Sequence, residues 1–136
     1  MVHQFLTKAY WSPGIPLGLV RRSIKGSLPV GVYDGRRQVG FARVITDYAT
    51  YAYIADVFVL EEYRGRGLSK LLMKSIMSHP KLQGLRRWSL VTRDAHGLYK
   101  QFGFQPLASP ERYMEIVRRD VYASSVPTKS RTRSTR

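Results

Sequence analysis

Hydrophobic and polar positions along the chain predict strands grouped around a few short helices. Apolar positions three and four residues apart indicate helices, and runs rich in Val, Ile, Phe and Tyr indicate strands. The predicted helices are Phe5–Trp11, a segment from Pro16 to about Gly26, a segment from Leu68 that stops before Pro80, and Ala95–Phe102. The predicted strands are Leu28–Tyr33, Gln38–Thr46, Tyr51–Val59, Trp88–Thr92 and Tyr113–Val117. Strands before a helix, followed by strand, helix and strand, indicate a mixed α/β or α+β sheet with helices packed on it.

Length and composition limit the number of domains and the chemistry. The 136 residues are 43% hydrophobic, which is enough for one domain with a core, and we expect that domain over residues 1–123. Residues 124–136 are rich in Ser, Thr and basic side chains, so we expect a disordered basic tail. The absence of cysteine excludes disulfides, thiolate metal sites and a cysteine nucleophile, and we expect no metal. No apolar run is long enough for a membrane span, and no secretion signal is recognisable, so we expect a cytoplasmic protein without a membrane partner.

The formal net charge of +14 raises affinity for polyanions such as nucleic acid and phosphorylated small molecules. A solvated basic surface is the simpler interpretation. Neither an arginine-rich helix nor a zinc-finger spacing is present, so a nucleic-acid partner is not favoured, although it stays open.

A glycine-bearing loop joins the strand ending at Val59 to the helix beginning at Leu68. It reads Arg64-Gly65-Arg66-Gly67-Leu68-Ser69-Lys70. Free N–H groups at a helix start attract phosphate, glycines let an anion approach the backbone closely, and the basic side chains add positive charge. The loop therefore predicts a pyrophosphate cradle, with an ordinary turn as the alternative. It lacks the Walker and the full dinucleotide-binding spacings.

A second motif reads Thr92-x-x-Ala95-x-x-x-Tyr99 and is followed by Gly103-Phe104. Together with Arg64-x-x-Gly67-x-Ser69, in this order and separated by a helix and a strand, it makes residues 29–117 resemble the GNAT superfamily of acyl-coenzyme A-dependent N-acetyltransferases. Two positions depart from the family pattern: Ser69 replaces the usual Gly or Ala, and Thr92 replaces the usual Asn. The family's first strand is also missing, so either the native start lies upstream of Met1 or that strand is dispensable.

The resemblance implies a central mixed, mostly antiparallel sheet with a splayed parallel pair, flanked by about four helices. It also implies acetyl-CoA as co-substrate, lying between the splayed strands. Its pantetheine arm would pair with the backbone of Val57, Phe58 and Val59, and a backbone N–H near Val59 would face the thioester oxygen. Its pyrophosphate would be held by Arg64, Gly65, Arg66, Gly67, Leu68, Ser69 and Lys70, with a further contact at Thr92.

The implied activity is direct transfer of the acetyl group to a primary amine of a small molecule or peptide in a ternary complex. Tyr99 matches the family's general acid, and Asp56 is a candidate general base. His96 and water are alternative bases, and a salt bridge with an arginine is the alternative role of Asp56. Two other functions stay open: a catalytically idle acyl-CoA sensor and a basic nucleic-acid-binding or ribosome-associated protein. The sequence also leaves open a homodimer.

Overall fold

The computed structural model describes residues 1–122, which its contacts divide into two units. One unit comprises residues 22–106 and contains the sheet; the other comprises residues 1–21 and the segment from Leu107 onward. The predicted tail, residues 124–136, lies outside the described residues. The expectation of one domain over residues 1–123 stays a prediction.

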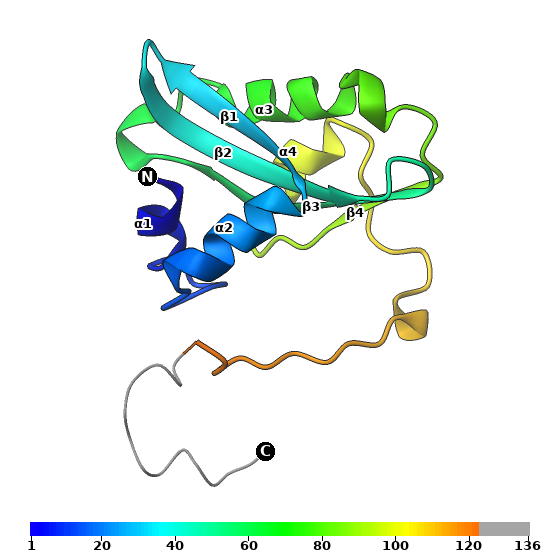
Figure 1. Cartoon of the computed structure of the whole chain (residues 1–136). Coiled ribbons are helices and arrows are strands. Elements are labelled where there is room, and N and C mark those ends of the chain that lie inside the picture. Colours follow the sequence, from blue (N-terminus) through cyan, green and yellow to red (C-terminus); the bar gives the residue numbers. More distant parts are fainter. Residues whose placement is uncertain (123–136) are drawn as a thin grey trace, which may run out of the picture. The chain divides into compact units, whose positions relative to one another are not determined.

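The sheet has the order β1-β2-β3-β4. Its strands are β1 (Leu28–Asp34), β2 (Arg37–Thr46), β3 (Tyr51–Val59) and β4 (Arg87–Leu90). The first three strands pair antiparallel, whereas β3 and β4 run parallel (Figure 1). This confirms the predicted mixed, mostly antiparallel sheet with one parallel pair.

Helix α3 (Leu68–Met77) covers one face of the sheet (Figure 1). Its Leu72, Met73 and Ile76 are buried in one cluster with Ala42, Val44, Ala52 and Ile54 of the strands. The short helix α4 (His96–Lys100) adds Tyr99 to the same cluster. The apolar spacing that predicted α3 therefore marks the face that packs on the sheet.

Two further helices lie near the N-terminus. Helix α2 (Leu17–Lys25) agrees with the predicted segment that starts at Pro16. Helix α1 (Val2–Leu6) begins and ends earlier than the predicted Phe5–Trp11. The chain turns after α1 because the buried hydroxyl of Ser12 donates to the carbonyl oxygen of Leu6 at 2.7 Å.

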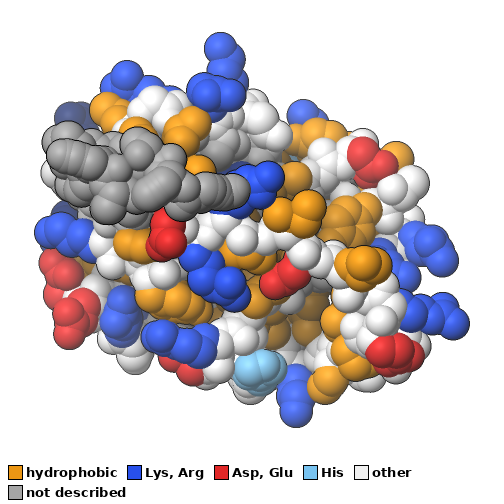
Figure 2. Space-filling model, turned by 90° about the horizontal axis from the view of Figure 1, so that it is seen from below, with side chains coloured by type: hydrophobic (Ala, Val, Ile, Leu, Met, Phe, Trp, Pro, Cys, Tyr) orange, Lys and Arg blue, Asp and Glu red, His pale blue; other side chains and the backbone are white. Residues whose placement is uncertain are grey.

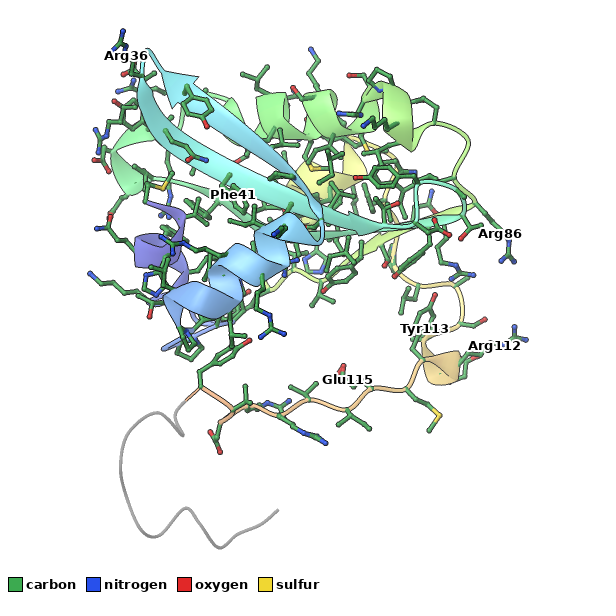
Figure 3. The ribbon with its side chains drawn as sticks, in the orientation of Figure 1. Arg36, Phe41, Arg86, Arg112, Tyr113 and Glu115 are labelled. Atoms are coloured by element: carbon green, nitrogen blue, oxygen red, sulfur yellow. The ribbon has the colours of Figure 1, made fainter. Side chains whose placement is uncertain are left out.

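The prediction of a strand over Tyr113–Val117 is wrong. This segment follows the short 3₁₀ helix η3 (Pro110–Arg112) and is extended, but it does not form a strand (Figure 3). Met114 and Ile116 are 96% and 85% exposed. The alternation of apolar and polar residues indicates a strand only when the backbone also finds an edge to pair with.

A hydrogen-bonded turn joins β2 to β3. The Asp47 carboxylate accepts hydrogen bonds from the backbone N–H groups of Ala49, Thr50 and Tyr51 and from the Thr50 hydroxyl. These bonds, first those from Thr50 and Ala49, hold the pKa of Asp47 well below its usual value. The turn helps to fix the register of β3, which carries the candidate site at its other end.

The packing of α3 predicts a clear difference between two positions of this helix. Replacing Ile76, which is fully buried, with alanine is expected to lower the free energy of unfolding by about 2–5 kcal/mol, because a cavity opens between α3 and the sheet. Leu71→Ala is the matched control, since Leu71 is 50% exposed on the same helix, and a change of about 0.5 kcal/mol or less is expected. Urea unfolding measures both; equal losses would contradict the packing described.

Candidate active site

Strand β3 bends at a bulge opposite β2. Phe41 pairs with Phe58 and Arg43 pairs with Ala55, so two residues of β3 lie opposite Ala42 alone. One of these two residues is Asp56, which has a left-handed backbone with φ of 56°. A bulge of this kind bends the strand and increases its twist.

Strands β3 and β4 part at this bend. Their parallel pairing runs from Tyr51 with Arg87 to Ile54 with Leu90, where β4 ends. β3 continues to Val59, so the edge of residues 55–59 that faces away from β2 has no strand beside it among the described residues. This open backbone edge can pair with an extended ligand in the manner of a strand.

The glycine loop lies directly beyond this edge. Gly67 caps the start of α3 with a left-handed backbone, φ 77°, and Gly65 has φ 79°. The Gly67 carbonyl accepts a hydrogen bond from the N–H of Leu71, so the N–H groups of the first turn point out of the helix start without intrahelical partners. A Cβ added at either glycine would meet no atom within 4 Å, so space for an anion lies beside the backbone.

A pocket of about 190 Å³ occupies the space between the end of β3, the loop and α4. It is lined by Val59, Tyr63, Arg64, Gly65, Gly67, Leu68, Ser69, Lys70 and Leu98. The structure thus brings together seven of the residues predicted to bind the cofactor. Val57, Phe58, Arg66 and Thr92 do not line this pocket, and neither do Asp56 and Tyr99.

Both arginines of the loop contact other residues of the chain. Arg64 donates from Nε to the carbonyl oxygen of Val59 at 3.0 Å, and the Arg66 guanidinium lies 4.9 Å from the centre of the Tyr63 ring. The Tyr63 hydroxyl donates to Asp34 at 2.8 Å, which ties the loop to the β1–β2 hairpin. Sequence reasoning missed Tyr63, although an aromatic residue directly before a glycine-rich loop is a usable signal.

The 3₁₀ turn η1 (Glu61–Tyr63) is held to the same hairpin by an exposed ion pair. Arg37 donates to the Glu62 carboxylate at 2.9 Å, and its guanidinium lies 5.4 Å from the Tyr63 ring centre. The Glu62 backbone N–H, together with this arginine, lowers the pKa of the Glu62 carboxyl. Tyr63 therefore contacts one basic side chain from the hairpin and one from the loop.

Tyr99 lies on α4 beside this pocket and is only 8% exposed. Its ring packs edge-on against Phe104, with 6.1 Å between ring centres, and the preceding residue, Leu98, lines the pocket. The Thr92 hydroxyl accepts a hydrogen bond from the N–H of Ala95 at 3.0 Å and so helps to start α4. His96 is exposed on the same helix.

Asp56 makes an ion pair. Its carboxylate accepts a hydrogen bond from Nε of Arg43 at 2.6 Å, and the two side chains are 11% and 17% exposed. The salt bridge that the sequence left open for this residue is therefore present. A role as general base stays a prediction, and the bulge at Asp56 places the pair at the parting of the parallel strands.

Charged side chains are spread over the face of the molecule in Figure 2, where Lys and Arg lie among hydrophobic and acidic side chains. Within residues 1–122, no three His, Asp or Glu side chains are placed to hold a metal ion. No helix in this part of the chain is long and apolar enough to cross a membrane.

The bent β3, the parted parallel pair and the glycine-rich helix start together define an acetyltransferase fold. Residues 27–106 match the family model of the acetyltransferase (GNAT) domain, and the chain belongs to this family. This confirms the resemblance seen in the two sequence motifs.

Known proteins are similar over most of the described fold. A crystal structure from Xanthomonas campestris assigned to the GNAT family is 54% identical, with a TM-score of 0.87 over 90% of this chain and 87% of that one. A Gibberella zeae protein named as an acetyltransferase is 28% identical over 66% of this chain; the match spans 62% of that protein's length. A Clostridium acetobutylicum acetyltransferase solved with acetyl-CoA shares the fold at 16% identity, with a TM-score of 0.64 over 85% and 84% of the two chains.

Proposed function

We propose that this protein is an N-acetyltransferase that moves an acetyl group from acetyl-CoA to a primary amine of a small molecule or peptide, with both substrates bound together. One observation carries the proposal: the open edge of β3 ends beside the start of α3 at Gly67, and one pocket joins them. This combination of a pairing edge and a helix N-terminus fits an extended arm that ends in a diphosphate.

The residues present fit acetyl-CoA. The backbone of Val57, Phe58 and Val59 would pair with the pantetheine arm, and the N–H groups from Gly65 to Lys70 would bind the pyrophosphate. The open space at Gly65 and Gly67 lets phosphate oxygens approach the backbone. Acetyl-CoA supplies an activated thioester, and a backbone N–H near Val59 would stabilise negative charge on its oxygen.

Proton transfer is assigned to side chains near the pocket. Tyr99 would act as the general acid that protonates the departing thiolate, from a helix whose Leu98 lines the pocket. Asp56, His96 or a water would accept the proton of the attacking amine. In the balanced reaction a carbon–nitrogen bond forms, the carbon–sulfur bond breaks with its electron pair on sulfur, and one proton moves from the amine to the thiolate.

Thermal unfolding of the full chain with acetyl-CoA tests the binding step. Ligand at about 100 times its Kd is expected to stabilise the fold by about 2.7 kcal/mol. No stabilisation, together with a salt-sensitive shift on adding an oligonucleotide, would overturn the proposal in favour of a nucleic-acid-binding protein. Free thiol released with a panel of amines then tests catalysis, and binding without thiol release would indicate an idle sensor.

A further inference from the structure

Arg43 occupies an unusual place in the sheet. Its neighbours Ala42 and Val44 are fully buried in the cluster beneath α3, so the alternation of side chains along β2 puts Arg43 on the opposite face, as it does Phe41. Arg43 pairs with Ala55, directly before the bulge of β3. Its side chain therefore starts on the strand next to β3, level with the point where β3 and β4 part.

Only part of the hydrogen-bonding capacity of the Arg43 guanidinium is engaged by the described residues. Nε donates to Asp56, and within residues 1–122 neither terminal nitrogen donates a hydrogen bond to the protein. The Arg43 side chain as a whole is 17% exposed, so it lies mostly within the fold. The two terminal nitrogens present four N–H donors on one planar fork, which can bind a polar ligand group.

A carboxylate is the partner that this fork fits. Arginine binds a carboxylate through two parallel N–H···O bonds, and the bond from Nε to Asp56 holds the plane of the guanidinium in place. Asp56 already balances the charge of Arg43, so a second carboxylate is held by directed hydrogen bonds more than by net charge. The chain's formal charge of +14 also favours an anionic acceptor over a polycationic one.

We propose that Arg43 binds the carboxylate of the amine acceptor, and that the acceptor class is amino acids. This inference rests on the proposed function. Bound in this way, the acceptor has its carboxylate at Arg43 and its amine close to Asp56 and the bend of β3. The Arg43–Asp56 pair therefore selects for a carboxylate next to the amine and orients both groups.

Matched acceptors test this selection with the full chain and acetyl-CoA. Each of several L-amino acids is compared with its own carboxamide, which keeps the shape and loses the charge, and thiol release is followed. The amino acid is expected to show a KM at least about tenfold lower than its carboxamide, as charge-assisted hydrogen bonds exceed neutral ones. Equal KM values for the two sets would overturn the inference and leave the proposed acetyl transfer intact.

Arg43→Lys provides the second measurement, because lysine keeps a positive charge beside Asp56 but loses the planar fork. The ratio of carboxamide KM to amino-acid KM is expected to fall by about tenfold, with acetyl-CoA affinity unchanged. Arg36→Lys is the matched control: Arg36 extends from the β1–β2 turn, and its variant keeps the wild-type ratio (Figure 3). An unchanged ratio in a folded Arg43→Lys protein would overturn the assignment to Arg43. If this variant does not fold, the wild-type comparison still decides the acceptor class. Failure of the wild-type chain to bind acetyl-CoA would instead refute the proposed function itself.

Discussion

Gly67→Asp is expected to weaken acetyl-CoA binding by at least about 100-fold, because like charges 4 Å apart near a protein surface repel by about 4 kcal/mol. Gly67 caps α3, and a Cβ there points into open space beside the N–H groups that would bind the pyrophosphate. An aspartate side chain would place its own carboxylate in that space. Isothermal titration of the folded variant with acetyl-CoA measures the effect.

Gly84→Asp is the matched control for this experiment. Gly84 also has a left-handed backbone, φ 79°, and open space around its Cα, so the substitution adds the same strain and the same charge. It lies between η2 (Pro80–Leu82) and β4, beyond the opposite end of α3. Its acetyl-CoA affinity is expected to stay within about threefold of wild type, as surface substitutions usually act weakly. Equal losses in both variants would remove the cradle from the proposed function.

Tyr99→Phe is expected to lower kcat by about 10²–10⁴-fold and to leave the Kd of acetyl-CoA nearly unchanged. Phenylalanine keeps the ring in the core and its edge-on packing with Phe104, while it removes the hydroxyl proposed as the proton donor. Steady-state thiol release and acetyl-CoA titration separate the two effects. A thermal unfolding scan shows whether the core has changed.

The control for this second prediction is Tyr33→Phe, since Tyr33 lies exposed on β1 outside the pocket. Its kcat is expected to equal that of the wild type. Full activity of Tyr99→Phe would assign the proton to water or to another group. A loss confined to acetyl-CoA affinity would give Tyr99 a binding role in place of a catalytic one.

The sheet and its helices follow from local patterns, and most of them could be predicted. The strand Tyr51–Val59 is predicted at both ends, because β-branched and aromatic residues fill it and it lies between a polar turn and a polar loop. The helix from Leu68 follows from its apolar spacing. The segment Tyr113–Val117 could not be judged in this way, because pairing depends on an edge elsewhere in the chain.

The part of the candidate site that glycines form could be predicted from the sequence. The part that depends on strand register and on the bulge in β3 could not. Gly65 and Gly67 have the left-handed backbones that make glycine necessary, and they line one pocket with Ser69 and Lys70. The bulge at Asp56 has no such signal, since a non-glycine residue adopts its positive φ. The partner of Asp56, thirteen residues earlier in the chain, depends on the β2–β3 register.

The bulge in β3 also determines what the deletion of one residue from this strand would do. It shifts the alternation by one residue, so that Ile54 and Val59, five positions apart, both belong to the cluster beneath α3. Deleting one residue at the bulge would place Ile54 and Val59 four positions apart, which plain alternation also puts on one face. Such a deletion is therefore expected to keep the packing beneath α3 and to remove the bend at which β3 and β4 part.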